Sequence, residues 1–249
     1  MLNLLSSSLF SSSKSLEQIN QDSILPPKRV GGGYLFAIAD GVGGYQGGGE
    51  AAQSVITYLE EYFTRELSNE LADLFPRLKK DVQKLSEINR DFIRAASTLT
   101  LCYVKHDSVL IGHIGDCRLY SKNGLKLKQL TKDHTQHQAY IDEGIFTARE
   151  LKNAKGKNIL TTAISNKGEL MFDIFKLNIE DVMDENGDIL LCIMSDGAHS
   201  FWEKRPRFSK NTMEEPSRFI SSLKKRIEKG PPVDDYSAIS IKFKIVNPS

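Results

Sequence analysis

The segment at residues 36–52, FAIADGVGGYQGGGEAA, joins an apolar run to a single carboxylate and then to a glycine-rich string. Six of the ten residues from 41 to 50 are glycine, so the backbone after Asp40 has unusual conformational freedom. A carboxylate at the end of a buried strand is costly unless it is paired or bound to a cation. A phosphate cradle, a flexible linker and a metal site all fit this pattern, and the rest of the chain has to decide between them.

The composition is that of an ordinary globular protein. The chain has 249 residues, of which 40% are hydrophobic and 26% charged, and it is long enough to bury a core without disulfides. We expect one domain over residues 1–249. The formal net charge of +1 offers no general attraction to nucleic acid or anionic lipid, so neither is expected as a partner.

The cysteines and the apolar runs indicate in which cellular compartment the protein is expected. Cys102, Cys117 and Cys192 lie in apolar stretches without a CxxC pair, which favours reduced thiols in the cytoplasm. The longest apolar run, residues 189–194, is far shorter than a membrane span. Residues 1–10 lack the basic n-region of a signal peptide, and a first strand is expected there.

The pattern of apolar residues predicts an α+β fold with antiparallel sheets. Helical spacing covers residues 50–67 and 76–96, with Pro76 suited to a helix start, and a further helix is expected at 216–228. Asn123-Gly124 predicts a hairpin turn, and a short polar, helix-like insert is expected at 140–154. Strands are expected at residues 35–39, 98–104, 109–114, 118–121, 171–177, 189–194 and 237–246. Consecutive strands with helices in separate groups favour sheets that helices cover.

Aspartates recur where these strands end or turn. Several carboxylates that converge without basic partners repel one another, and a divalent cation removes that repulsion; such hard oxygen ligands suit Mg²⁺ or Mn²⁺. Any one of these aspartates alone is equally typical of a turn or a helix cap, and spacing does not show that they converge. The strings are NQD (20–22), ADGVGG (39–44), GDCR (115–118), SDG (195–197) and DDYS (234–237).

In this order the strings resemble those of the metal-dependent protein phosphatases, the type 2C serine/threonine family, in its bacterial form. The resemblance covers residues 20–246 and includes LTKDHT (130–135), IDEGIFTARELKN (141–153) and NILTTAIS (158–165). It implies a four-layer α-β-β-α sandwich, in which helices flank two stacked antiparallel sheets. It also implies a small flap at about residues 136–157.

The resemblance implies a set of metal ligands at one edge of the sheets. Asp40 is expected to bridge two metal ions, and the backbone carbonyl of Gly41 to bind one of them. Asp196 and Asp234 are expected to hold the other ion, and Asp116 to share a weaker third ion with Asp196.

Further residues are expected to support these ligands. Asp22 is expected to act on the metal pair through water and hydrogen bonds, and Gln21 and Asp235 to hold the ligands in place. Catalysis is thus assigned to Asp22, Asp40, Asp196 and Asp234, acting through bound metals and water.

The implied activity is hydrolysis of phosphoserine and phosphothreonine on proteins. Two Mn²⁺ or Mg²⁺ ions, with a possible third, serve as cofactors, and a metal-bridging hydroxide attacks phosphorus directly without a phosphoenzyme. The implied partner is a phosphoprotein substrate of a serine/threonine kinase, acted on by a cytoplasmic monomer.

The sequence departs from the family pattern at three positions. Glu17 stands where many members have an arginine that grips the phosphate, with Lys14 or Lys28 as possible replacements. Val42 stands where eukaryotic members often have a histidine. Ser200 replaces an acidic residue that helps the third metal. The possible substrate region comprises Glu17, Lys28, Arg118 and His134.

Other hypotheses remain open at the level of sequence. A phosphatase-like binding or regulatory module with weak or no turnover is motivated by Glu17. A phosphate-accepting receiver domain also has clustered aspartates, but it requires alternating strands and helices. A zinc site at His134 and His137 is disfavoured because no cysteine or further histidine is near them in sequence.

Overall fold

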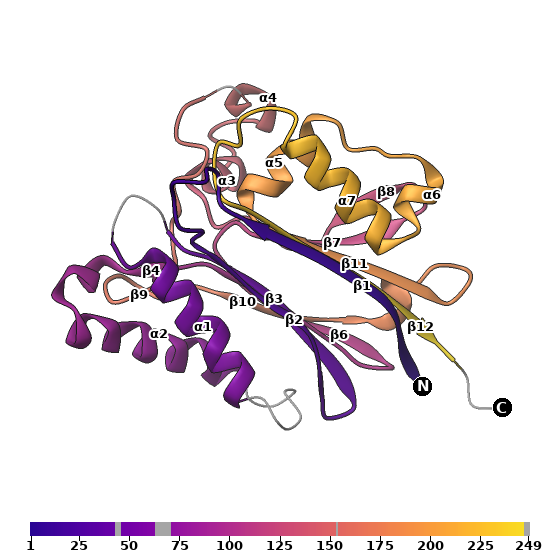
Figure 1. Cartoon of the computed structure of the whole chain (residues 1–249), viewed down its shortest axis with the longest axis horizontal. Coiled ribbons are helices and arrows are strands. Elements are labelled where there is room, and N and C mark those ends of the chain that lie inside the picture. Colours follow the sequence, from indigo (N-terminus) through magenta and orange to yellow (C-terminus); the bar gives the residue numbers. More distant parts are fainter. Residues whose placement is uncertain (43–45, 63–70, 153, 247–249) are drawn as a thin grey trace.

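Two antiparallel sheets stack on each other, and helices cover the outer face of each (Figure 1). The computed structural model describes residues 1–42, 46–62, 71–152 and 154–246. The predicted four-layer α-β-β-α sandwich is therefore confirmed, and its antiparallel sheets exclude the receiver-domain hypothesis.

The first sheet has the order β1-β12-β11-β7-β8. Its first and last strands in sequence pair along almost their whole length, from Leu2 opposite Ile245 to Ser12 opposite Tyr236. Between β7 and β8, Gly124 has a φ of 59°, as the predicted hairpin turn requires. The strands are β1 (Leu2–Ser12), β7 (Arg118–Asn123), β8 (Lys126–Gln129), β11 (Asp188–Met194) and β12 (Tyr236–Ile245).

The second sheet has the order β10-β6-β5-β3-β2. Its edge strand β2 includes Pro26 and Pro27, and the sequence did not predict a strand there. The pairing register shifts between Leu25 and Lys28, and a prolyl residue is tolerated at such an irregular edge because no ladder hydrogen bond is required of it. The strands are β2 (Asp22–Val30), β3 (Gly33–Asp40), β5 (Leu99–Val104), β6 (Ser108–Ile114) and β10 (Asp173–Asn178). A third, two-stranded sheet pairs β4 (Ala96–Ser97) with β9 (Ile164–Ser165).

Helices α1 (Gly48–Tyr62) and α2 (Leu71–Ile88) cover the second sheet (Figure 1). The predicted helix start at Pro76 was wrong, because α2 begins at Leu71 and Pro76 lies inside it. The predicted end at 96 was also wrong. Asn89 caps a separate 3₁₀ turn, η1 (Arg90–Arg94), by accepting a hydrogen bond from the backbone N–H of Asp91. The predicted helix at 50–67 is confirmed as far as α1 extends, and residues 63–67 lie outside the described part of the chain.

The first sheet is covered by α5 (Asp196–Lys204), α6 (Lys210–Met213) and α7 (Pro216–Ile227), of which only α7 was predicted (Figure 1). The expected polar insert forms two short helices, α3 (Gln136–Asp142) and α4 (Ala148–Leu151). A 3₁₀ turn, η2 (Ile179–Asp181), follows β10. Within the described residues, no helix is long and apolar enough to span a membrane.

The core forms three apolar layers that alternate with the secondary-structure layers. The middle layer lies between the sheets and includes Phe36, Ile38, Leu191 and Phe243. Helices α1 and α2 pack on the second sheet through one outer layer, and α5 and α7 pack on the first sheet through the other. Because β3 lies between two apolar layers, residues 35–39 are all buried, and the first half-buried position after them is Asp40.

Candidate metal centre

Asp40 and Asp22 face each other at one edge of the second sheet. They are register partners, at the end of β3 and the start of β2. The backbone of Asp40 is fixed by Thr98, whose Oγ1 accepts from the Asp40 N–H (3.0 Å) and whose N–H donates to the Asp40 carbonyl (2.8 Å). No described residue donates a hydrogen bond to the Asp40 carboxylate, although its backbone is held on both sides.

Asp22 is linked to the first sheet by a serine hydroxyl. Ser195 Oγ donates to Asp22 Oδ2 (2.9 Å) and accepts from the Ser237 N–H (2.9 Å). Asp22 Oδ1 is buried and has no hydrogen-bond partner among the described residues. The sequence hypothesis did not assign a role to Ser195, although it lies within the SDG string. Its hydroxyl joins the two sheets at the site.

Asp235 fixes the N-terminal segment over the same edge. Its Oδ1 accepts from the backbone N–H of Lys14 (2.8 Å) and its Oδ2 from that of Gln21 (2.7 Å). The Gln21 carbonyl in turn accepts from the Gly41 N–H (3.1 Å). Gln21 and Asp235 therefore connect the start of β12, the segment before β2 and the loop after β3.

A cavity of about 810 Å³ opens on this edge. Asp234 is exposed beside Lys14, whose Nζ lies 3.6 Å from its carboxylate. Asn158, which directly follows the predicted flap, donates to Asp196 Oδ2 (2.6 Å). Asn158 was missed as a site residue, although it begins the NILTTAIS string. The carboxylates that line the cavity belong to Glu17, Asp40, Asp116, Asp196, Asp234 and Asp235.

Two glycines allow the backbone to close around the cavity. A Cβ on Gly41 would lie 2.4 Å from backbone atoms of Gly48 and 2.8 Å from the carbonyl oxygen of Gln21. A Cβ on Gly197 would lie 2.0 Å from the carbonyl oxygen of Asp235. Gly43 and Gly44, in the glycine-rich string, lie outside the described residues.

Asp116 is buried behind the main group of carboxylates. Its carbonyl oxygen lies 3.1 Å from Nε2 of the buried His199. Ser200, at the position where an acid would help a third metal, donates its hydroxyl to the Gly197 carbonyl (3.3 Å). The side chain of Ser200 is thus engaged with its own helix.

Three residues of the predicted substrate region lie outside the cavity lining. Arg118 pairs with Asp133 (2.6 Å) and with Glu203. Lys28 donates to the Glu60 carbonyl on α1. His134 accepts from the Gly115 N–H and lies 3.2 Å from Asp173. Glu17 and Lys14 do line the cavity.

The carboxylates destabilise one another's ionised forms. Burial raises the pKa of Asp22 to about 7 and that of Asp196 to about 6. Burial, and the charges of Asp22, Asp196 and Asp116, raise the pKa of Asp40 well above its usual range. Burial and the charge of Asp196 do the same for Asp116. A cation in the cavity would remove this repulsion.

The donor set fits a hard divalent cation that keeps much of its water. Asp40 has no donor and Asp22 Oδ1 is buried without a partner, so both carry acceptor capacity that the described protein does not satisfy. Among the described residues, no group of three or more His, Cys, Asp and Glu side chains is gathered closely enough to hold a metal ion by itself. Mg²⁺ binds through a few carboxylates and several waters, so this open arrangement suits it better than it suits zinc.

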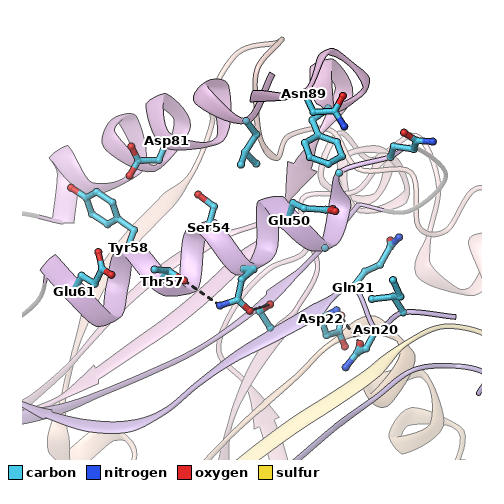
Figure 2. A pocket seen from close by; sticks show the side chains of 18 residues that line it. Asn20, Gln21, Asp22, Glu50, Ser54, Thr57, Tyr58, Glu61, Asp81 and Asn89 are labelled. Atoms are coloured by element: carbon cyan, nitrogen blue, oxygen red, sulfur yellow. Dashed lines mark hydrogen bonds between the residues drawn. The ribbon is translucent and has the colours of Figure 1, made fainter. Parts of the chain in front are cut away.

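A groove of about 1030 Å³ continues from the cavity along α1 (Figure 2). It shares Gln21 and Ile19 with the cavity lining. Figure 2 shows Glu61 and Asp81 at one end of the groove and Asp22 at the other. The described residues that line it include no lysine, arginine or histidine.

Comparisons with known proteins agree with this geometry. The family model for protein phosphatase 2C matches residues 12–234. Protein phosphatase PhpP of Streptococcus pneumoniae is 29% identical over 184 residues, which cover 72% of each chain.

Solved structures share the fold at lower identity. The serine/threonine phosphatase Stp1 from Staphylococcus aureus superposes with a TM-score of 0.80 at 18% identity, over 98% of this chain and 96% of that one. The catalytic domain of PstP in complex with two manganese ions gives a TM-score of 0.75 at 23% identity, over 98% and 100% of the two chains.

Proposed function

The chain belongs to the protein phosphatase 2C family, and we propose that it is a divalent-metal-dependent phosphatase that hydrolyses phosphoserine and phosphothreonine on proteins. The observation that carries the proposal is the Asp40 carboxylate. It lies in a cavity with Asp116, Asp196 and Asp234 and has no described donor. The activity named for PhpP and the two manganese ions of the PstP structure support the same reading.

Asp40, the Gly41 carbonyl, Asp196 and Asp234 are the proposed holders of two Mn²⁺ or Mg²⁺ ions, and Asp116 of a weaker third. When bound, such ions lower the pKa of water and neutralise charge on phosphoryl oxygens. Asp22 accepts from Ser195 and is proposed to support the metal pair through water and hydrogen bonds. Ser200 offers the third ion no carboxylate, so its affinity is expected to be low.

Lys14 is the cation placed to meet the substrate phosphate. Its Nζ lies beside Asp234, and among the described residues it is the only cation in the cavity lining. Glu17 lines the same cavity and repels a phosphate, which lowers the expected affinity. Val42 supplies no proton, so water has to protonate the leaving serine or threonine oxygen.

The finer assignments follow from the family. We infer a phosphoprotein substrate produced by a serine/threonine kinase, and a cytoplasmic monomer with one domain over residues 1–249. The flap at about 136–157 is the proposed substrate-selecting segment, and Asn158, which directly follows it, donates to Asp196 in the site.

The test is a phosphatase assay on a phosphothreonine peptide and a small aryl phosphate, with Mn²⁺ and with Mg²⁺. Wild type should turn over both, and Asp40→Asn should lower kcat more than about 100-fold because a ligand charge is lost. Glu17→Arg should lower KM several-fold with little change in kcat. Glu87→Gln, on the exposed end of α2, is the matched control and should match wild type.

The alternative is a phosphatase-like binding module, which the proposed carboxylate ligands disfavour. Inactivity of the wild type with every divalent cation would overturn the enzymatic proposal, and the absence of calorimetric Mn²⁺ binding would favour the binding module.

A further inference from the structure

A second cavity, of about 750 Å³, lies between the end of α5, the segment that follows it and α7. We call it the basic cavity. Six of the ten residues that line it are cations, and among the described residues no carboxylate lines it. The cations are Lys204, Arg205, Arg207, Lys225, Arg226 and Lys229.

This concentration of charge is unusual for the chain as a whole. The sequence has 33 lysines and arginines against 32 aspartates and glutamates. Lys210 and Lys224, which lie on the neighbouring surface, each pair with a glutamate four residues later. No such ion pair forms at any of the six cations within the described part of the chain, so their mutual repulsion is not offset by the protein.

The cavity wall is held rigidly by Arg226. Its guanidinium donates to the carbonyls of Arg205 (2.6 Å) and Arg207 (2.9 Å) and lies 3.9 Å from the Phe208 ring centroid. Burial and the charge of Arg205 lower the pKa of Arg226. Arg226 therefore uses its donors to fix the wall, whereas Lys225 and Lys229 remain exposed at the rim.

We propose that the basic cavity binds an acidic peptide segment in extended form, through carboxylates at alternate positions. Lys225 lies in the last turn of α7, and Lys229 lies two residues beyond the end of that helix at Ile227. Side chains on one face of an extended chain repeat at about 6.5 Å, so such a peptide offers successive carboxylates to several of the cations that line the cavity. Arg205 and Arg207 also line the cavity and add two further positive charges.

Two other anionic partners fit less well. A single-stranded nucleic acid stacks its bases on free aromatic rings, but here Lys204 covers Phe201 at 4.3 Å and Arg226 covers Phe208. A membrane presents a flat surface, whereas these cations surround a hollow.

The basic cavity is separate from the metal centre. The two cavities share no lining residue. Helix α5 connects them, with Asp196 at its start and Lys204 at its end, about 12 Å along its axis. Binding at the basic cavity therefore does not depend on the proposed catalytic activity.

The test is fluorescence anisotropy of a short labelled peptide with glutamate at alternate positions, titrated with the full chain. Lys225→Glu/Lys229→Glu should weaken binding at least about tenfold, since two ion pairs become two repulsions. Lys80→Glu/Lys167→Glu makes the same change in net charge at exposed positions outside the cavity lining and should stay within about threefold of wild type. Thermal unfolding of each variant confirms that it is folded.

Three results would overturn the proposal. One is equal weakening by both double variants, which indicates a general charge effect. Another is equal affinity for a peptide in which glutamine replaces glutamate. The last is tighter binding of a short single-stranded DNA, or of vesicles with anionic lipid, than of the acidic peptide.

Discussion

Gly41 decides how closely three segments of the chain approach one another at the proposed centre. Its N–H donates to the Gln21 carbonyl, and its Cα faces the backbone of Gly48 at the start of α1. There is no space for a side chain at position 41, because the atoms that it would contact belong to the backbone. Backbone atoms cannot move aside as the end of a flexible side chain can. The glycine at this position is therefore needed for packing as well as for its proposed carbonyl ligand.

Gly41→Ala should destabilise the fold by about 1–3 kcal/mol, because the new Cβ is forced against backbone atoms. Gly32→Ala is the control, since nothing lies within 4 Å of a Cβ there. Chemical denaturation of both variants measures the difference in the free energy of unfolding. Equal stability of the two variants would show that the approach of Gly41 to Gly48 is not needed.

At the scale of elements, α1 and α2 form a groove that begins at the metal centre. Glu50 and Glu61 are eleven residues apart on α1, about 16 Å along the helix, which an extended peptide of about five residues spans. Leu85 and Phe92 provide apolar surface in the same groove. The stem of a lysine or arginine packs on such a surface while its charge meets the carboxylates.

The groove predicts that phosphopeptides with arginines within about five residues of the phosphorylated residue have a higher kcat/KM than matched peptides with glutamates. Glu50→Gln/Glu61→Gln should reduce that preference several-fold. Glu60→Gln/Glu87→Gln removes the same charge outside the groove lining and should keep it. The preference is measured at low and moderate salt, where screening should weaken it. A preference that both double variants retain in full would contradict the role of the groove.

At the scale of the whole molecule, charge is segregated although the net charge is only +1. Carboxylates gather at the sheet edge and along α1, and unpaired cations gather between α5 and α7. Each group destabilises the chain unless a ligand of opposite charge binds. A divalent cation is the proposed ligand of the first group, and an acidic segment that of the second.

The buried carboxylates determine how stability depends on pH. Asp22, Asp40, Asp116 and Asp196 have raised pKa values in the folded chain, so they keep protons that the unfolded chain loses above about pH 4. The protonated carboxylates therefore contribute to the stability of the folded chain at low pH. This contribution is lost as the pH rises toward about 7, the pKa of Asp22.

Two buried histidines have the opposite effect on the pH dependence of stability. Burial lowers the pKa of His113 to about 4 and that of His199 well below its usual value. The unfolded chain therefore binds two more protons at these histidines below about pH 6.5. The four carboxylates outnumber them, and the net effect in the metal-free protein is a loss of stability as the pH rises.

Without divalent cations, Tm should therefore fall between about pH 5 and about pH 7. Mn²⁺ or Mg²⁺ should raise Tm, and by more at the upper end of this range, because the cation competes with protons for the same oxygens. Asp40→Asn should show a smaller fall and a smaller response to cation. Thermal unfolding with chelator measures the fall of Tm with pH, and thermal unfolding with added cation measures the rise of Tm on binding. A metal-free Tm that rises with pH would contradict the raised pKa values.

Much of the fold follows from local pattern. The alternation of apolar residues, the Asn123-Gly124 turn and the Pro216 helix start are local features, and the strands and helix predicted from them are present. The order of the aspartate strings was sufficient to identify the family. The start of α2 and the strand character of β2 were missed because packing on the core overrides the local preference of proline.

The sequence by itself determined most of the strands, the helices α1 and α7, the antiparallel sandwich and the identity of the proposed ligands. Only the tertiary structure decided which residues surround those ligands. Ser195 meets Asp22, and Asp235 meets Gln21, across 173 and 214 residues of sequence. The same holds for the basic cavity, where α5 and α7 come together. Such contacts depend on how sheets and helices stack. The spacing of residues along the chain does not show which distant residues this stacking brings together.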